Sequence, residues 1–222
     1  MNNLSSKSKA TLTMKPIEPT IRVADEIPGY SYGHVSVPTS PVSTESLEGL
    51  KASAGFMDED AGYLRLAGTV LTGQTRQIVA KWRSEIIASI PNLARHSRTP
   101  EGEPIPEYLA KSNLRFEQWI LDTCFREYDQ AWLDYQREIA LRHTSAKKNE
   151  VDGVLSTAFV PFHDAIAFVA VMNETIKPFL ANKGNTEDEV NAMHRAWSKS
   201  LQMQMALWAQ PYIEVSRTST EW

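Results

Sequence analysis

The chain has 222 residues, of which 42% are hydrophobic, so it is long enough to bury the core of a single domain. Its net charge of -4 offers no basic surface for nucleic acid, and no stretch approaches the ~20 consecutive apolar residues of a membrane-spanning helix. Its single cysteine, Cys124, excludes an internal disulfide and a cysteine-based metal cluster, and it indicates a reducing, cytoplasmic setting.

The two ends of the chain differ in composition from the middle. Residues 1–26 are polar and lack both hydrophobic periodicity and the apolar segment of a secretory signal, so we expect a disordered extension. The sequence Ile-Pro-Gly-Tyr-Ser-Tyr-Gly at 27–33 predicts a turn whose two tyrosines can pack against a core. The domain is therefore expected to span 27–212, followed by a mobile tail at 213–222.

Between these ends the apolar residues recur at helical spacing, and no alternating strand pattern is present. Prolines punctuate the pattern, so one helix should stop before Pro91 and the last before Pro211. The pattern predicts an all-α domain without choosing among a bundle, a solenoid and a globin. The expected helices are 43–54, 58–71, one after Gly73 that reaches Ile90, 107–125, 128–143, 161–181 and 186–209.

His143 is the strongest candidate for chemistry. It ends an apolar helix face that also carries Tyr128, Trp132, Tyr135 and Ile139, so its ring should point inward. One interpretation is a core histidine satisfied by a backbone carbonyl. The other is an iron ligand, because haem needs a single neutral imidazole, an open opposite site and apolar walls. The position alone leaves both open.

The residues around His143 are basic. Arg137, Arg142, Lys147 and Lys148 could pair with two haem propionates, or they could form a solvated helix end that complements the helix dipole. No two histidines have HxxxH spacing, and the chain has neither a nucleophile elbow nor a nucleotide-binding glycine loop. Zinc-hydrolase, serine-hydrolase and nucleotide-binding classes are therefore disfavoured.

Several stretches in the same order resemble the protoglobins, which are single-domain haem globins of archaea and bacteria related to the sensor domains of globin-coupled sensors. The main ones read DTCFREYDQAWLDYQREIALRH at 122–143 and IPGYSYG at 27–33. Others read GEPIPEYL at 102–109, RFEQWILDT at 115–123 and TIKPFLANKG at 175–184. The resemblance covers about Ile27 to Tyr212.

This resemblance implies an all-α globin fold, a helical sandwich around haem with an extra N-terminal helix. It implies haem b (iron protoporphyrin IX), reversible binding of O2, CO and NO, and a homodimer packed through the last two long helices. The histidine of the family's Leu-Arg-His motif matches His143, and the family's pocket aromatics match Trp82, Phe116 and Phe168. The residues expected around the haem are His143, Trp82, Arg83, Phe116, Ile120, Tyr135, Arg142 and Phe168.

Arg83 departs from the family pattern, which usually has a tyrosine directly after the residue that matches Trp82. Its helix neighbours Val79, Ile86 and Ile87 are apolar. Arg83 could lay its stem on this apolar surface and keep its guanidinium in water. Alternatively, the guanidinium reaches a haem-bound ligand or a propionate. The departure puts any transfer of the family's ligand affinities in doubt.

Two other functional classes remain open. A haem enzyme acting on peroxide, nitrite or NO would also use a distal arginine, and a gas-sensor module would signal to a separate partner. We also expect the last two long helices to carry more apolar residues than packing within one chain needs, which suggests a two-fold dimer. The residues concerned are Phe162, Ile166, Val169, Phe179, Met193, Trp197, Leu201, Met205 and Trp208.

Overall fold

The computed structural model describes residues 27–216, in which helices are joined by short turns and two longer loops. The extension expected at 1–26 and most of the tail expected after residue 212 lie outside the described residues. The helices are α1 (Thr44–Ala54), α2 (Asp58–Leu71), α3 (Thr75–Ala80), α4 (Pro91–Ala94), α5 (Pro106–Phe125), α6 (Gln130–Leu141), α7 (Phe162–Leu180) and α8 (Glu187–Ser216).

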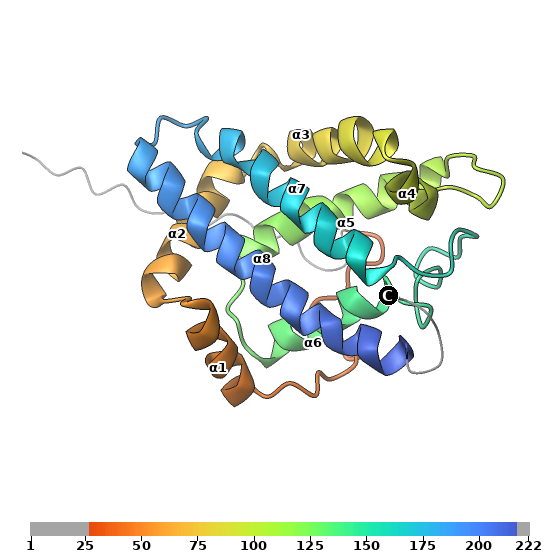
Figure 1. Cartoon of the computed structure of the whole chain (residues 1–222), viewed down its shortest axis with the longest axis horizontal. Helices are drawn as coiled ribbons and strands as arrows, with labels where there is room; N and C mark the ends of the chain where they lie inside the picture. Colours follow the sequence, from red (N-terminus) through yellow and green to blue (C-terminus); the bar gives the residue numbers. More distant parts are fainter. Residues whose placement is uncertain (1–26, 217–222) are drawn as a thin grey trace, which may run out of the picture.

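The helices form two layers (Figure 1). Figure 1 shows α7 and α8 running side by side across α5 and α6, while α1 and α2 lie beside one end of α8. α8 contacts α1, α2, α5, α6 and α7, which makes it the central element of the packing. The prediction of an all-α domain is confirmed for the described residues, because they contain no strand and only one isolated bridge, between Arg98 and Pro104.

Most predicted helices are present with ends within a few residues of expectation, but the segment after Gly73 is irregular. α3 is followed by a π-helical stretch at Lys81–Ile86 and a 3-10 turn at Ile87–Ser89 before the backbone extends at Ile90. Pro91 then starts α4, where its missing N–H costs nothing. π-Helical stretches occur frequently at functional sites, and this one carries Trp82 and Arg83.

The predicted end of the last helix before Pro211 is wrong, because α8 continues through this proline to Ser216. Tertiary contacts hold the extra turn. The Tyr212 hydroxyl donates to the carbonyl of Val160 at 2.8 Å, and Arg137 donates to Glu214 at 2.8 Å. These contacts offset the backbone hydrogen bond that a proline removes.

The prediction that α6 continues to His143 is also wrong. The helix ends at Leu141, and the N–H of His143 bonds to the carbonyl of Ala140 at 2.9 Å in a tighter turn. His143 therefore stands one residue past the Arg142 cap, at the start of a long series of turns.

The segment at 27–33 packs as predicted. The Tyr30 ring is buried edge-on against Tyr135, with 5.4 Å between centroids, and its hydroxyl donates to Asp122 at 2.7 Å. Tyr32 makes a second edge contact with Tyr135, also at 5.4 Å. The N-terminal end of the described chain is thus fixed to α5 and α6.

Most of the apolar residues that the sequence suggested as a surplus on the last two long helices are buried within the chain, so the exposed apolar surface is smaller than expected. Trp197 and Met193 are fully buried, and Val169 is 3% exposed, whereas Ile166 is 43% exposed. The correction arises because α8 is covered on most sides by α1, α2, α5, α6 and α7. Also buried are Phe179, Leu201, Met205 and Trp208.

Candidate functional site

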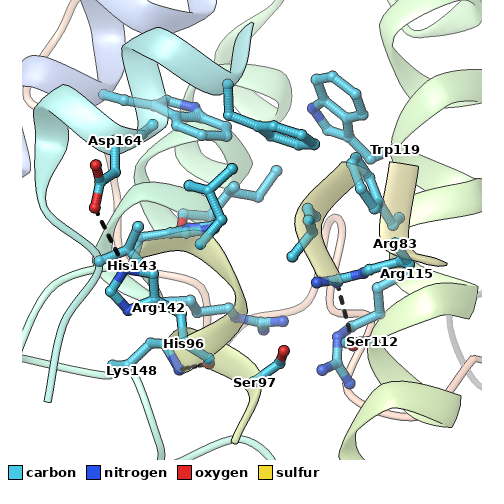
Figure 2. A pocket seen from close by; sticks show the side chains of 18 of the residues that line it. Arg83, His96, Ser97, Ser112, Arg115, Trp119, Arg142, His143, Lys148 and Asp164 are labelled. Carbon is cyan, nitrogen blue, oxygen red and sulfur yellow. Dashed lines mark hydrogen bonds and ion pairs between the residues drawn. The ribbon is translucent and has the colours of Figure 1, made fainter. Parts of the chain in front are cut away.

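A cavity lies between the π-helical stretch, α5, α6, α7 and α8, and its rim is closed by the end of α4 with the 3-10 turn at Arg95–Ser97 and by the turns at 142–152. It encloses about 1320 Å³ of empty space, counted with its open mouth. Figure 2 shows aromatic rings along one wall and cationic side chains around the rest. An apolar cavity with a few converging polar groups is the usual form of a cofactor site. The apolar lining includes Phe116, Trp119, Ile139, Phe168, Val169, Met172 and Trp208.

His143 lines this cavity with one ring nitrogen fixed and the other without a partner. Its Nδ1 lies 2.8 Å from the carbonyl of Ile139, one of the carbonyls left free at the end of α6. A carbonyl only accepts, so Nδ1 carries the proton and Nε2 has the lone pair. No hydrogen bond of Nε2 occurs within the described residues. The two interpretations of His143 are therefore compatible, because Nδ1 bonds to a backbone carbonyl while Nε2 is left for an iron.

The His143 ring is also held in place and kept neutral. It stacks on Trp208, with 5.4 Å between centroids and 24° between planes. Burial lowers its pKa to about 4, so the imidazole is neutral at pH 7 and keeps only the Nδ1 proton. A metal-binding histidine typically donates its second N–H to a backbone carbonyl, which fixes the ring and its tautomer. His143 has this arrangement with its free nitrogen in the cavity.

Three of the four basic residues near His143 already have protein partners. Arg137 pairs with Glu214, and Lys147 pairs with Glu138 at 2.7 Å. Arg142 lines the cavity but also pairs with Glu138 and donates to the carbonyl of Gly29. Each of these three residues already pairs with a carboxylate of the chain. Neither a solvated helix end nor a partner for a haem propionate therefore describes them fully.

Lys148 is the fourth, and it differs. Its side chain is buried beside the cavity, where Nζ donates to the carbonyl of His96 at 3.1 Å and lies 5.4 Å from the centre of the Tyr108 ring. Burial lowers the pKa of Lys148 to about 8. Among residues 27–216 it forms no ion pair, so it is a cation with room for an anionic partner.

Arg83 is half-buried, and its guanidinium turns to groups of α5 at the cavity wall rather than extending from the outer surface. Its Nε donates to Asn113 Oδ1 at 3.1 Å, and its Nη2 donates to Ser112 Oγ at 3.3 Å. The guanidinium carbon lies 5.3 Å from the centre of the Phe116 ring. Arg83 takes this position because α5 lies beside the π-helical stretch and offers it these polar and aromatic groups at the cavity wall (Figure 2).

Six of the eight residues expected around a haem line the cavity, namely Arg83, Phe116, Tyr135, Arg142, His143 and Phe168. Trp82 and Ile120 do not line it and are fully buried behind its wall. The Trp82 ring lies 5.1 Å from Phe116, and its Nε1 donates to Thr175 at 2.8 Å. Trp82 therefore supports the wall.

Sequence reasoning missed a polar group at the rim. His96 is buried, with Nδ1 2.8 Å from Thr157 Oγ1 and Nε2 3.5 Å from Asp164 Oδ2. Arg115 of α5 pairs with Asp152 of the long loop through both carboxylate oxygens. These partners are 37 to 68 residues apart in sequence, so no local spacing could have linked them. The one available signal was Asp164, an acid next to the apolar run Ala165–Met172.

The residues that the structure describes hold no group of three or more His, Cys, Asp or Glu side chains arranged for a metal ion. None of the described helices combines the length and apolar character needed to cross a membrane. The site thus has one free imidazole nitrogen facing an apolar cavity with cations at its rim. That donor set fits a haem, which brings its own four nitrogen ligands and two carboxylates, better than a bare metal ion.

An all-α sandwich with an inward imidazole and an apolar cavity defines a globin-type protein. The Protoglobin family profile matches residues 43–218. The chain therefore belongs to the protoglobin family, whose members are globin-type proteins that bind haem and gases. No curated protein matches the chain.

Proposed function

We propose that this protein binds O2, CO and NO reversibly at the iron of a haem b held by His143. The observation that carries the proposal is the His143 ring, whose Nδ1 is fixed on Ile139 while Nε2 faces the cavity with no partner among the residues that the structure describes. When bound, haem would supply an iron with one face open to a small ligand.

The other residues have supporting roles in this proposal. Phe116 and Phe168 provide apolar walls that keep water from the macrocycle, and Trp208 restricts rotation of the His143 ring. Lys148 is the cation best placed for a haem propionate, because within residues 27–216 its side chain donates only to a neutral carbonyl. Arg142 can share this role only in part, since Glu138 already accepts from it.

Haem uptake is the direct test. The haem-free protein titrated with haemin should reach an end point at one haem per chain and give a Soret band. That band should shift on reduction and again on adding CO, because the iron keeps one open face. A folded protein that takes up no haemin, measured by absorption with circular dichroism as the check on folding, would exclude the proposal.

We also propose a homodimer that pairs the exposed faces of α7 and α8. Ile166, Ala167 and Ala170 form an exposed apolar strip on α7, and Ala206 is exposed on α8. Small residues of this kind let two helices approach closely, and two-fold dimers are the most common assembly. Sedimentation at micromolar concentration should show a species of twice the 25.0 kDa chain mass.

A matched pair of variants tests the location of this interface. Ala170→Arg on the proposed face should shift the protein toward monomer, because a long charged side chain cannot be buried between the helices. Ala110→Arg, at an exposed position of α5, should leave the assembly unchanged. Equal effects of both substitutions, or a monomeric parent protein, would contradict the interface.

A further inference from the structure

Arg83 is a cation inside the cavity whose contacts are all neutral. Its hydrogen bonds go to the Asn113 amide and the Ser112 hydroxyl, and its flat face lies over Phe116. Within the described part of the chain no carboxylate pairs with it. The other two cavity arginines differ, because Arg115 pairs with Asp152 and Arg142 pairs with Glu138.

Such an arrangement is costly for the fold. Removing a guanidinium from water without an opposite charge carries a penalty that neutral hydrogen bonds offset only in part. Burial accordingly lowers the pKa of Arg83, and the charge of Arg115 acts in the same direction. The Arg83 guanidinium has five N–H donors, and two of them account for its hydrogen bonds to Asn113 and Ser112. Donors are therefore left for a further partner.

The cavity as a whole is positive although the chain is acidic. Its charged lining comprises Arg83, Arg115, Arg142 and Lys148 against Asp152 and Asp164. Asp152 is taken by Arg115, and Asp164 lies 3.7 Å from Arg95 and 3.5 Å from His96. The chain's net charge is -4, so the positive potential is a local property of this cavity rather than of the molecule.

Arg83 and His143 approach the cavity from different walls. Figure 2 shows Arg83 on the side formed by α5 and the π-helical stretch, and His143 on the opposite side. A ligand bound on the face turned away from His143 therefore lies toward Arg83. Lys148 and His96 stand on the His143 side of the view, so the two unpaired cations serve different parts of the cavity.

We infer that Arg83 makes this cavity a binding site for small inorganic anions, of the class that includes azide and nitrite, as ligands on the side facing away from His143. The inference rests on the proposed haem function, and it specifies that the preferred ligands carry a negative charge. Arg83 donates charge-assisted hydrogen bonds to such an anion, and these are about twice as strong as neutral ones. Neutral ligands such as CO and imidazole gain no comparable attraction.

The test compares azide with neutral ligands on the haem-loaded ferric and ferrous protein. Arg83→Leu should weaken azide binding by roughly 10-fold to 100-fold, the range that corresponds to losing a hydrogen bond to a charged group. Arg83→Lys should retain most of the azide affinity because it keeps the charge. Imidazole affinity and CO dissociation should change far less in both variants. Arg65→Leu is the control, since Arg65 pairs with Glu127 at the surface.

A second measurement needs no haem. The haem-free Arg83→Leu protein should unfold at a higher urea concentration than the wild type, because it loses an uncompensated charge from the cavity wall. A haem-free variant that is less stable, together with unchanged azide binding, would make Arg83 a structural residue and overturn the inference.

The remaining outcomes separate the two proposals. Faster haem loss from Arg83→Leu with unchanged azide affinity would assign Arg83 to a propionate and overturn the inference alone. A protein that shows no Soret band in any variant would overturn the haem function and the anion site together.

Discussion

Replacing His143 with alanine should remove the protein's hold on haem. The imidazole Nε2 of His143 lines the apolar cavity with no hydrogen bond among the described residues, whereas the ring of His96, another histidine of the lining, lies against Thr157 and Asp164. Loss of even a supporting group around a metal ligand costs 10-fold to 100-fold in affinity, so loss of the ligand itself should cost at least about 100-fold. The measurement is the rate at which haem transfers from the variant to an excess of a haem-free acceptor globin.

Free imidazole provides the rescue, because it fits the space that the alanine leaves and offers the same nitrogen. Haem retention by His143→Ala should therefore rise with imidazole concentration. His194→Ala is the matched control. His194 also places a ring nitrogen 2.8 Å from a backbone carbonyl, that of Asn173, but it does not line the cavity. A His143→Ala protein with unchanged spectrum and haem retention would assign the iron ligand to another residue.

Replacing Gly68 with valine should destabilise the fold by about 3 kcal/mol, the upper part of the range for over-packed cores. α2 and α5 approach so closely here that a Cβ at Gly68 would lie 2.5 Å from Phe125 Cζ and 2.7 Å from Cys124 Cβ. Both atoms are held, since Cys124 is buried on α5 and Phe125 packs on the core. The free energy of unfolding from urea denaturation measures the effect.

Gly62 supplies the control on the same helix. It is exposed, and a Cβ there meets no atom within 4 Å. Gly62→Ala should therefore stabilise the protein by roughly 0.5–1 kcal/mol, because alanine loses less backbone entropy in a helix than glycine does. A lower free energy of unfolding for Gly68→Val together with a higher one for Gly62→Ala would place the close contact at Gly68. Changes of the same sign would contradict it.

The helices could be predicted because each buries one apolar face, so apolar residues recur at helical spacing in the local sequence. The last turn of α8 could not, because it depends on contacts of Tyr212 with Val160 and of Glu214 with Arg137, which come from distant segments. The irregular backbone at Lys81–Ile86 was equally invisible to a 3.6-residue pattern.

The candidate site divides in the same way. His143 was found from its apolar stripe and from the family motif, although its turn lies beyond the end of α6. The half-buried position of Arg83 follows from its hydrogen bonds to Ser112 and Asn113, about 30 residues away on another helix. The His96 and Asp164 contact and the Arg115 and Asp152 pair needed the three-dimensional fold to appear at all.

The segment at 27–33 has a kinetic consequence. Its carbonyls at Pro28 and Gly29 accept from Arg115 and Arg142, which both line the cavity, and Arg142 directly precedes His143. Tyr30 and Tyr32 pack this segment on Tyr135, so the two arginine contacts can break and re-form while the helices and this packing stay in place. The rate at which a bound group exchanges with solvent can then change through these two arginines without a change in the walls that set its equilibrium affinity. We therefore expect substitutions of these two arginines to change the residence time of a bound group more than its equilibrium affinity.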